Sequence, residues 1–249
     1  MNKIIYSVDV EKDLHSGGYN SIRYGLKEFE KLCDRHKIKP VLYITSNCIK
    51  DNKDIFLKLK RKGWQLGLHG HSHKRFDEMK YQEKEDELKK GLFIFRKYLK
   101  TRPIGFRAPQ HSIDNDTLDL LDKHGFKHDS SYTPLNLLQL LFFPKKTTLW
   151  AKLFFSRPNS YKIRKNLLEI PASSLFIPFV SLTLRVFPRW LIGIYLSLIK
   201  LIYKTPVFYA HSWDFIELKE SRIDRSFSHK RFLSNLDYVM YMENKNEKS

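Results

Sequence analysis

The sequence predicts an α/β fold with a mostly parallel sheet, and three observations favour it. Short apolar runs alternate with amphipathic helical stretches, and polar side chains recur where the apolar runs end. The chain has 249 residues, a length at which single-domain α/β barrels are common. We therefore expect one domain over residues 1–249, with its functional side chains at the carboxyl ends of the strands.

The strands of the first half are short apolar runs, several of them rich in β-branched residues or preceded by Gly or Pro. Gly63 stands before the third run and Gly125 before the fifth. The predicted strands are Ile4–Val10, Pro40–Thr45, Gln65–Leu68, Ile104–Arg107 and Phe126–Asp129.

Helices are predicted between these strands from apolar residues that recur on one face. After a turn at Gly17 and Gly18, the side chains of Leu26, Phe29 and Leu32 share such a face. A short helix is expected over Ile55–Arg61, and another over Asn115–His124 that ends at Gly125. The clearest helix is Glu83–Leu99, whose apolar stripe consists of Leu88, Leu92, Phe95 and Leu99.

The second half is less regular. We expect an irregular basic and apolar excursion around residues 134–204, and two further strands over Leu167–Pro171 and Pro206–His211. The most apolar stretch, Leu175–Tyr203, is interrupted by three basic residues and is too short to span a bilayer. The polar tail after Tyr241 is expected to fray.

Composition excludes several classes of protein. Hydrophobic residues make up 42% of the chain, too many for a disordered protein. Cys33 and Cys48 are too few for a disulfide framework and lack zinc-finger spacing, which favours a reducing compartment. No signal peptide is recognisable at the start of the chain. The 45 Lys and Arg outnumber the 27 Asp and Glu, for a net charge of +18.

The strongest local motif is His-Gly-His-Ser-His at residues 69–73. In an extended strand His69 and His73 would lie about 13 Å apart, whereas a turn brings them to roughly 6 Å. Gly70 permits such a turn, and His71 falls off the shared face. The motif alone is weak, because a solvated polar loop has the same composition.

A pair of carboxylates supplies the missing oxygen ligand. Asp9 and Glu11 follow the first strand and are separated by one residue, so both point to the same side. Catalytic zinc commonly takes three protein ligands and leaves one position for water. One carboxylate can therefore hold a metal while the other accepts a proton from its water.

Taken together, the motifs resemble those of the polysaccharide deacetylases, the family 4 carbohydrate esterases, in the branch whose first motif is Asp-Val-Glu or Asp-Val-Asp. The likeness covers nearly the whole chain and implies a distorted (β/α) barrel of about seven parallel strands. The matching motifs, in family order, are SVDVE (7–11), GLHGHSHKRF (67–76), GFRAP (105–109), HDSS (128–131), LEIP (168–171), LRVFP (184–188) and FYAHSWDF (208–215).

The resemblance implies a role for each matching residue. Asp9 falls on the general base and His211 on the general acid. Arg107 is implied to orient the base, and Asp129 to be the partner of the acid. The implied ligands of a divalent metal, zinc by preference, are Glu11, His69 and His73.

Three positions depart from the common family pattern. The first motif has Asp9-Val10-Glu11 instead of two adjacent Asp, which leaves open which of the two acids is the base. Gln65 replaces a Glu ahead of the metal motif, and the late motif reads His211-Ser212-Trp213-Asp214.

The implied function is removal of an N-acetyl group from an amino sugar in a polysaccharide, oligosaccharide or lipid-linked glycan, in cell-surface polysaccharide biosynthesis. Two alternatives stay open. One is a catalytically inactive glycan-binding module of the same fold. The other is a nucleic-acid binder, which the charge of +18 favours but the absence of any helix-turn-helix, zinc-finger or RNA-binding motif does not.

The basic charge can also be explained by contact with a membrane. Lys and Arg beside the apolar stretch Leu175–Tyr203 can hold the protein on an anionic membrane surface. We therefore expect a cytoplasmic protein that is peripheral at the cytoplasmic membrane and binds no nucleic acid. The sequence leaves the oligomeric state open.

Overall fold

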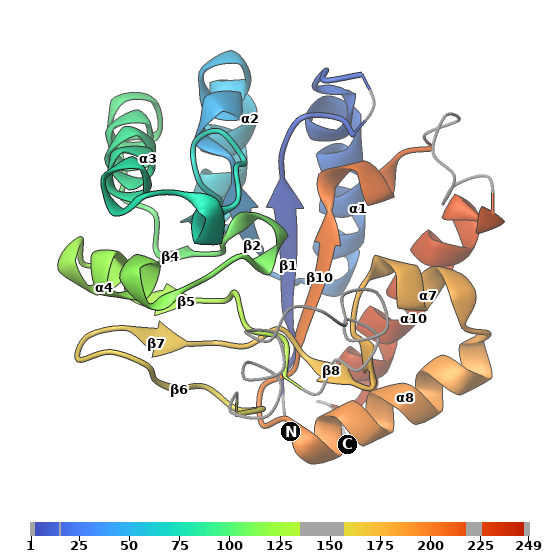
Figure 1. Ribbon diagram of the computed structural model, residues 1–249. Coiled ribbons are helices and arrows are strands. Elements are labelled where there is room, and N and C mark those ends of the chain that lie inside the picture. The colour runs from blue at the N-terminus through green and yellow to red at the C-terminus, as the bar shows by residue number, and fades with distance from the viewer. Residues whose placement is uncertain (1–2, 15, 135–156, 218–225, 247–249) are drawn as a thin grey trace.

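The computed structural model describes residues 3–14, 16–134, 157–217 and 226–246. Its centre is an eight-stranded sheet in the order β10-β1-β2-β3-β4-β5-β7-β6. Seven strands are parallel, and β6 at the edge is antiparallel to β7. The sheet curls into part of a barrel, with helices on its outer side (Figure 1). The predicted fold class is confirmed.

The first half of the chain builds five of these strands in sequence order. They are β1 (Ile5–Val10), β2 (Val41–Ile44), β3 (Gln65–Leu68), β4 (Gly105–Phe106) and β5 (His128–Asp129). Every residue of β2 and all but the first of β1 are buried, as expected for parallel strands covered on both faces.

The connecting helices agree with the predicted ones in place and face. They are the π-helical turn η1 (Ser21–Gly25), α1 (Leu26–His36), α2 (Ile49–Arg61), α3 (Tyr81–Ile94), η4 (Phe95–Leu99) and α4 (Asn115–Lys123). Helix α2 begins six residues earlier than predicted, because Ile49 and Asn52 are buried along with Phe56.

The second half contains more structure than the sequence predicts. The described part of the expected excursion forms β6 (Tyr161–Lys162), β7 (Leu168–Glu169), the hairpin of β8 (Ser174–Leu175) and β9 (Ile177–Pro178), α7 (Ser181–Val186) and α8 (Arg189–Ile202). Residues 135–156 of that excursion lie outside the described residues. The chain continues with β10 (Val207–His211), the 3₁₀ turn η6 (Ser212–Phe215) and α10 (His229–Asn246).

The described part of the tail after Tyr241 is helical up to Asn246, where fraying was expected, and residues 247–249 lie outside the described residues. Helix α10 continues to Asn246, and its buried Glu243 accepts hydrogen bonds from the Ile4 amide (2.6 Å) and the Tyr6 hydroxyl (2.8 Å). No described helix is both long and apolar enough to cross a membrane. The single-domain boundary over residues 1–249 stays a prediction.

Candidate metal and catalytic site

The loop after β3 brings His69 and His73 together. Gly70 has a φ of +73° and His73 a φ of +61°, so the chain turns sharply where the sequence predicts a turn. The two imidazole centroids lie 5.2 Å apart. A carboxylate oxygen of Glu87 accepts hydrogen bonds from the backbone N–H groups of His71 (3.0 Å) and Ser72 (2.9 Å), which fixes the loop on α3.

Three side chains form a cluster with the geometry of a metal site. One donor atom from each of Glu11, His69 and His73 lies within 4.8 Å of the others. The Nε2 atom of His73 is 2.6 Å from a carboxylate oxygen of Glu11. The third imidazole of the loop, that of His71, bonds to Ser46 through Nδ1 (2.9 Å).

The tautomer of His69 suits a metal ligand. Its Nδ1 is 2.8 Å from the carbonyl oxygen of Arg107, and a carbonyl only accepts, so Nδ1 carries the proton and Nε2 is left to ligate. Burial lowers the pKa of His69, which keeps the imidazole neutral. Two imidazoles and a carboxylate therefore fit a divalent ion with one open position.

Asp9 lies beside this cluster but has a different partner. It accepts a hydrogen bond from Nη1 of Arg107 at 2.8 Å, and both side chains are buried. Burial alone would raise the pKa of Asp9, but the charge of the Arg107 guanidinium, together with the nearby imidazoles of His69, His211 and His111, outweighs it and holds that pKa well below its usual range. Asp9 is therefore ionised at neutral pH.

Arg107 is held in place from several sides. Its Nε donates to the carbonyl oxygen of Ser130 and its Nη2 to the Ser130 hydroxyl, both at 2.9 Å. The guanidinium carbon lies 4.3 Å from the ring centroid of Tyr43 and 5.3 Å from that of Tyr209. These contacts compensate a buried charge and aim Nη1 at Asp9.

His211 ends the strand next to β1, in register with Asp9. Its backbone N–H donates to Asp214 Oδ2 at 2.8 Å, and the same oxygen lies 3.6 Å from its Nδ1. Burial opposes the charged imidazole, but the hydrogen bond and charge of Asp214 outweigh it and raise the pKa of His211 to about 9. Trp213 stacks on the imidazole, with centroids 4.5 Å apart.

The structure gives His211 a partner other than the predicted Asp129. Asp129 accepts a hydrogen bond from the Ser131 hydroxyl at 2.6 Å and stands in register with Glu169 of β7. Strand β5 is separated from β10 by β1 to β4, so its end lies across the curled sheet. Asp214 follows His211 by three residues, and this short spacing was the signal in the sequence.

One further residue near the site, His111, was not predicted as a contributor. The His111 side chain is half-buried, and its Nδ1 lies 2.9 Å from the Ser131 carbonyl oxygen. Its Nε2 has no hydrogen-bonding partner among the described residues. Gln110 and His111 both have left-handed backbones, with φ of +54° and +55°. Such strained pairs are typical of functional loops.

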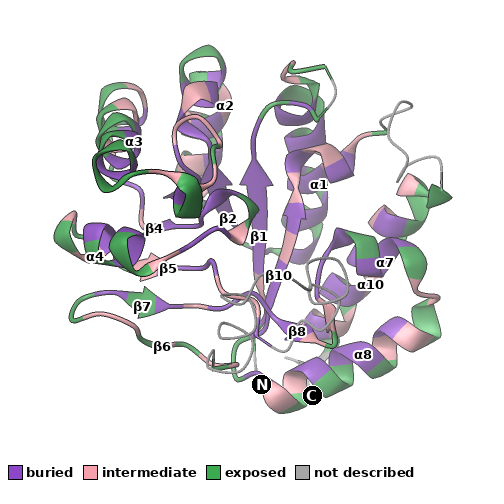
Figure 2. Cartoon of the chain, in the orientation of Figure 1, coloured by how far each residue is buried: buried purple, intermediate pink, exposed green. Residues whose placement is uncertain are grey.

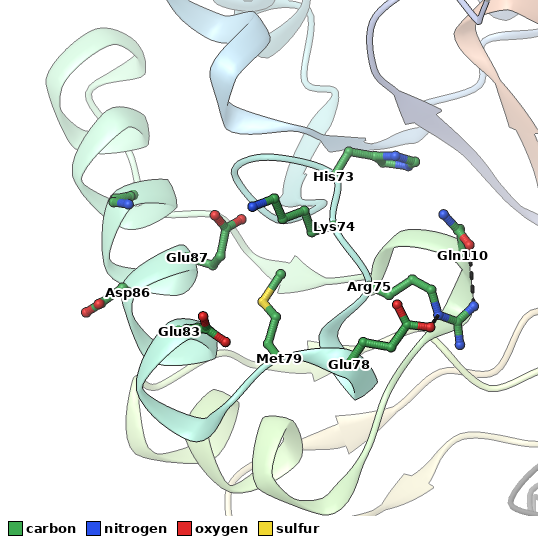
Figure 3. Close-up of a pocket in the computed structure, with 10 residues that line it drawn as sticks. His73, Lys74, Arg75, Glu78, Met79, Glu83, Asp86, Glu87 and Gln110 are labelled. Carbon is green, nitrogen blue, oxygen red and sulfur yellow. Dashed lines mark hydrogen bonds and ion pairs between the residues drawn. The ribbon is translucent and has the colours of Figure 1, made fainter.

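Two hollows open on the cluster. One of about 410 Å³ is lined by side chains that include Glu11, His73, Gln110 and Trp213. The other, of about 570 Å³, shares His73 and Gln110 with the first. Figure 3 shows that charged side chains of the loop after β3 and of α3 surround it. A molecule longer than one sugar unit can therefore extend away from the cluster.

Comparisons with known proteins point to one family. Residues 23–128 match the family described as polysaccharide deacetylase. A peptidoglycan deacetylase-like protein of Gibberella zeae is 26% identical over 171 residues, which cover 64% of this chain and 49% of that protein. A peptidoglycan deacetylase of Helicobacter pylori is 25% identical over 177 residues, 66% of this chain and 56% of that protein. The chain thus spans about half the length of these relatives.

Solved structures share the fold at low sequence identity. A provisionally assigned polysaccharide deacetylase from Mycobacterium smegmatis has a TM-score of 0.67 at 13% identity. The match covers 98% of this chain and 86% of the other. A pseudoenzyme of carbohydrate esterase family 4 from Bacillus anthracis has a TM-score of 0.55 at 10% identity, over 99% and 62% of the two chains. The family match over residues 23–128, the two relatives and the shared fold together support the polysaccharide deacetylase family for this chain.

Proposed function

We propose that the protein is a metal-dependent hydrolase that removes the N-acetyl group from an amino sugar of a glycan. The observation that carries the proposal is the placement of an ionised carboxylate, Asp9, in register with a cationic imidazole, His211, beside a three-donor cluster. Hydrolysis of an amide needs a proton acceptor for water and a proton donor for the amine, and the two strand ends supply them.

Glu11, His69 and His73 would hold the ion, and we propose zinc because this donor set is typical of its catalytic sites. When bound, the ion would supply polarisation of a water molecule and of the acetamide carbonyl. Asp9 accepts a proton from the water, and Arg107 holds the carboxylate in place and ionised.

His211 donates the proton that lets the amine depart. Asp214 keeps the imidazole protonated, so the proton is present before the C–N bond breaks. Trp213 stacks on the same ring and limits its rotation. The backbone near Gln110, which lines both hollows, is where we propose that the developing negative charge on the acyl oxygen is stabilised.

For the substrate, we propose an N-acetylated glycan of the cell surface, because the relatives with significant similarity are named peptidoglycan deacetylases. The two adjoining hollows provide space for sugar units on either side of the reacting one. We also propose a cytoplasmic protein, peripheral at the membrane, in a pathway of surface polysaccharide biosynthesis.

An inactive glycan-binding module is the second candidate. The observation that favours it is that a pseudoenzyme of the family shares this fold. The two candidates differ in turnover: a binding module would hold metal and glycan without releasing acetate. Nucleic acid is not expected as a partner.

The test is metal analysis joined to an assay of acetate release from N-acetylglucosamine oligomers. Purified protein is expected to hold about one zinc per chain and to release acetate. A His69→Ala, His73→Ala double variant should lose both, whereas His71→Ala, in the same loop but bonded to Ser46, should keep the metal. An unchanged metal content in the double variant would contradict the assignment of His69 and His73 as ligands.

Asp9→Asn separates the two acids of the first motif. It should keep the metal and lose turnover by roughly 10²–10⁴-fold, the usual contribution of a positioned proton acceptor. Loss of the metal from this variant would show that Asp9 is a ligand, and the roles of Asp9 and Glu11 would then be exchanged. Metal-loaded wild-type protein that binds oligomers without releasing acetate would establish the binding module.

A further inference from the structure

Helix α8 exposes an apolar stripe. Its side chains at 190, 194, 198 and 201 follow helical spacing and are 68%, 52%, 44% and 82% exposed: Trp190, Ile194, Leu198 and Leu201. The opposite face of the helix is buried through residues such as Ile192, Tyr195 and Ile199. Figure 2 shows exposed residues along the outer edge of α8. The helix is therefore apolar on both faces.

The stripe lies at the end of the molecule opposite the candidate site. Figure 1 shows α8 along the lower edge, beside the start of β1 and both chain ends, while the arrowhead of β1 points away from it. Residues 203–206 connect α8 directly to the start of β10. From Ile5 to Glu11 the chain rises roughly 20 Å. The cluster of Glu11, His69 and His73 is thus at least that far from this end.

The same end of the molecule is basic. Parallel strands begin there and helices finish there, and Lys residues occupy many of these positions: Lys3, Lys37, Lys39, Lys100, Lys204 and Lys245. The carboxylate of Glu243 at this end is buried and bonded to Ile4 and Tyr6. Between Val186 and Asp214 the sequence has three basic residues, Arg189, Lys200 and Lys204, and no acidic one. The stripe is thus bordered by positive charge.

We propose that this end, formed by the α8 stripe and its surrounding lysines, docks on an anionic bilayer with the active site facing away from the membrane. Fourteen helical residues span about 21 Å, less than the roughly 30 Å hydrocarbon core, so α8 lies in the interface and does not cross it. Apolar side chains enter the headgroup boundary while lysines attract anionic lipids.

This orientation narrows the range of possible substrates, an inference that rests on the proposed function. A sugar attached to a short lipid carrier in the same bilayer stays close to the headgroups, whereas the active site lies beyond them, on the aqueous side. A glycan chain that extends into solution reaches the site without this conflict. The geometry therefore points to a polymer or long oligosaccharide.

Vesicle flotation tests the docking directly and needs no enzymatic activity. Wild-type protein should float with vesicles of phosphatidylcholine and phosphatidylglycerol at 0.1 M salt, and recovery should fall severalfold in 1 M salt or with phosphatidylcholine alone. Leu198→Ser with Leu201→Ser, or Lys204→Glu with Lys245→Glu, should each lower recovery severalfold. Phe93→Ser on α3, and Lys50→Glu with Lys53→Glu on α2, are matched controls that should float like wild type.

The orientation is tested with an environment-sensitive fluorophore on a single introduced thiol. On anionic vesicles, a label at Ser197→Cys within the stripe should shift to the blue, and one at Lys53→Cys on α2 should not. A shift only at position 53 would overturn the orientation. The docking proposal would be overturned if the stripe variants floated as well as the control variants. It would also be overturned if the stripe substitutions changed only the oligomeric state, from dimer to monomer.

Discussion

At the residue scale, Asp9 and Glu11 have different roles because their surroundings differ. Asp9 contacts a buried guanidinium and Glu11 contacts an imidazole, although only one residue separates them in the sequence. Period-two spacing predicted that both point to one side, and the structure places both at the site. Which partner each acid meets depends on Arg107, nearly a hundred residues away, and no local pattern reveals it.

Asp214 is a positioning residue whose removal should change the pH profile of the proposed deacetylase. A general acid must be protonated, so wild-type activity should fall as the pH rises through about 9. In Asp214→Asn, only the charges of Asp9 and Glu11 still oppose the lowering of the His211 pKa by burial, and the alkaline limb should move down by at least about one pH unit. The pH dependence of kcat measures this.

Asp54→Asn is the control, because this exposed carboxylate of α2 lies away from His211 and should leave the profile unchanged. A profile of Asp214→Asn that keeps its alkaline limb while kcat drops at every pH would mean that Asp214 supports only the local fold. In that case another group would have to keep His211 protonated.

At the element scale, the strands with the clearest pattern were predicted best. The limits of β3 match the prediction, and β1, β2 and β10 differ from it by a residue or two, because each contains an apolar run that stands out in the sequence. The two-residue strands β6, β8 and β9 were missed, whereas β4, β5 and β7, which are equally short, lie within predicted strands. Strand order was not readable either, so the pairing of Asp129 with His211, which the family resemblance implied, could not be checked against the sheet.

The register of β5 and β7 places two buried carboxyls side by side, and this pairing should cost stability at high pH. Burial, the charge of Asp129 and a hydrogen bond to it hold the pKa of Glu169 well above its usual range. The folded protein therefore keeps a proton that the unfolded chain loses above about pH 4.3, and stability falls as the pH rises.

Glu169→Gln should relieve this effect, because an amide cannot ionise and can still donate to Asp129. At pH 8 the free energy of unfolding of the variant should exceed that of wild type by at least about 1.4 kcal/mol, so its melting temperature should be higher. The difference in stability should shrink towards pH 4. Thermal unfolding across this range is the measurement. Glu28→Gln, on the exposed side of α1, should track wild type; a Glu169→Gln variant that melts lower at every pH contradicts the account.

At the scale of the whole molecule, the charge and the apolar helix acquire a common location that composition could not give. A net charge of +18 predicts an anionic partner but no position for it. The βα topology collects helix ends and strand starts at one end of the molecule and the proposed catalytic residues at the other. The two proposed functions, docking and hydrolysis, are thereby separated in space.

The ends of the described chain are also joined, which the polar composition of the tail did not predict. A single buried acid, Glu243, accepts hydrogen bonds from the Ile4 amide and the Tyr6 hydroxyl on β1. Glu243→Ala leaves both buried donors without an acceptor, at a cost of about 1–3 kcal/mol each. Urea unfolding should therefore show a lower midpoint with an unchanged slope, as expected for lost stability without a change in exposed surface. Lys245→Ala, exposed on the same last turn of α10, should unfold like wild type, and an equally stable Glu243→Ala variant would show that α10 does not clamp the central strand.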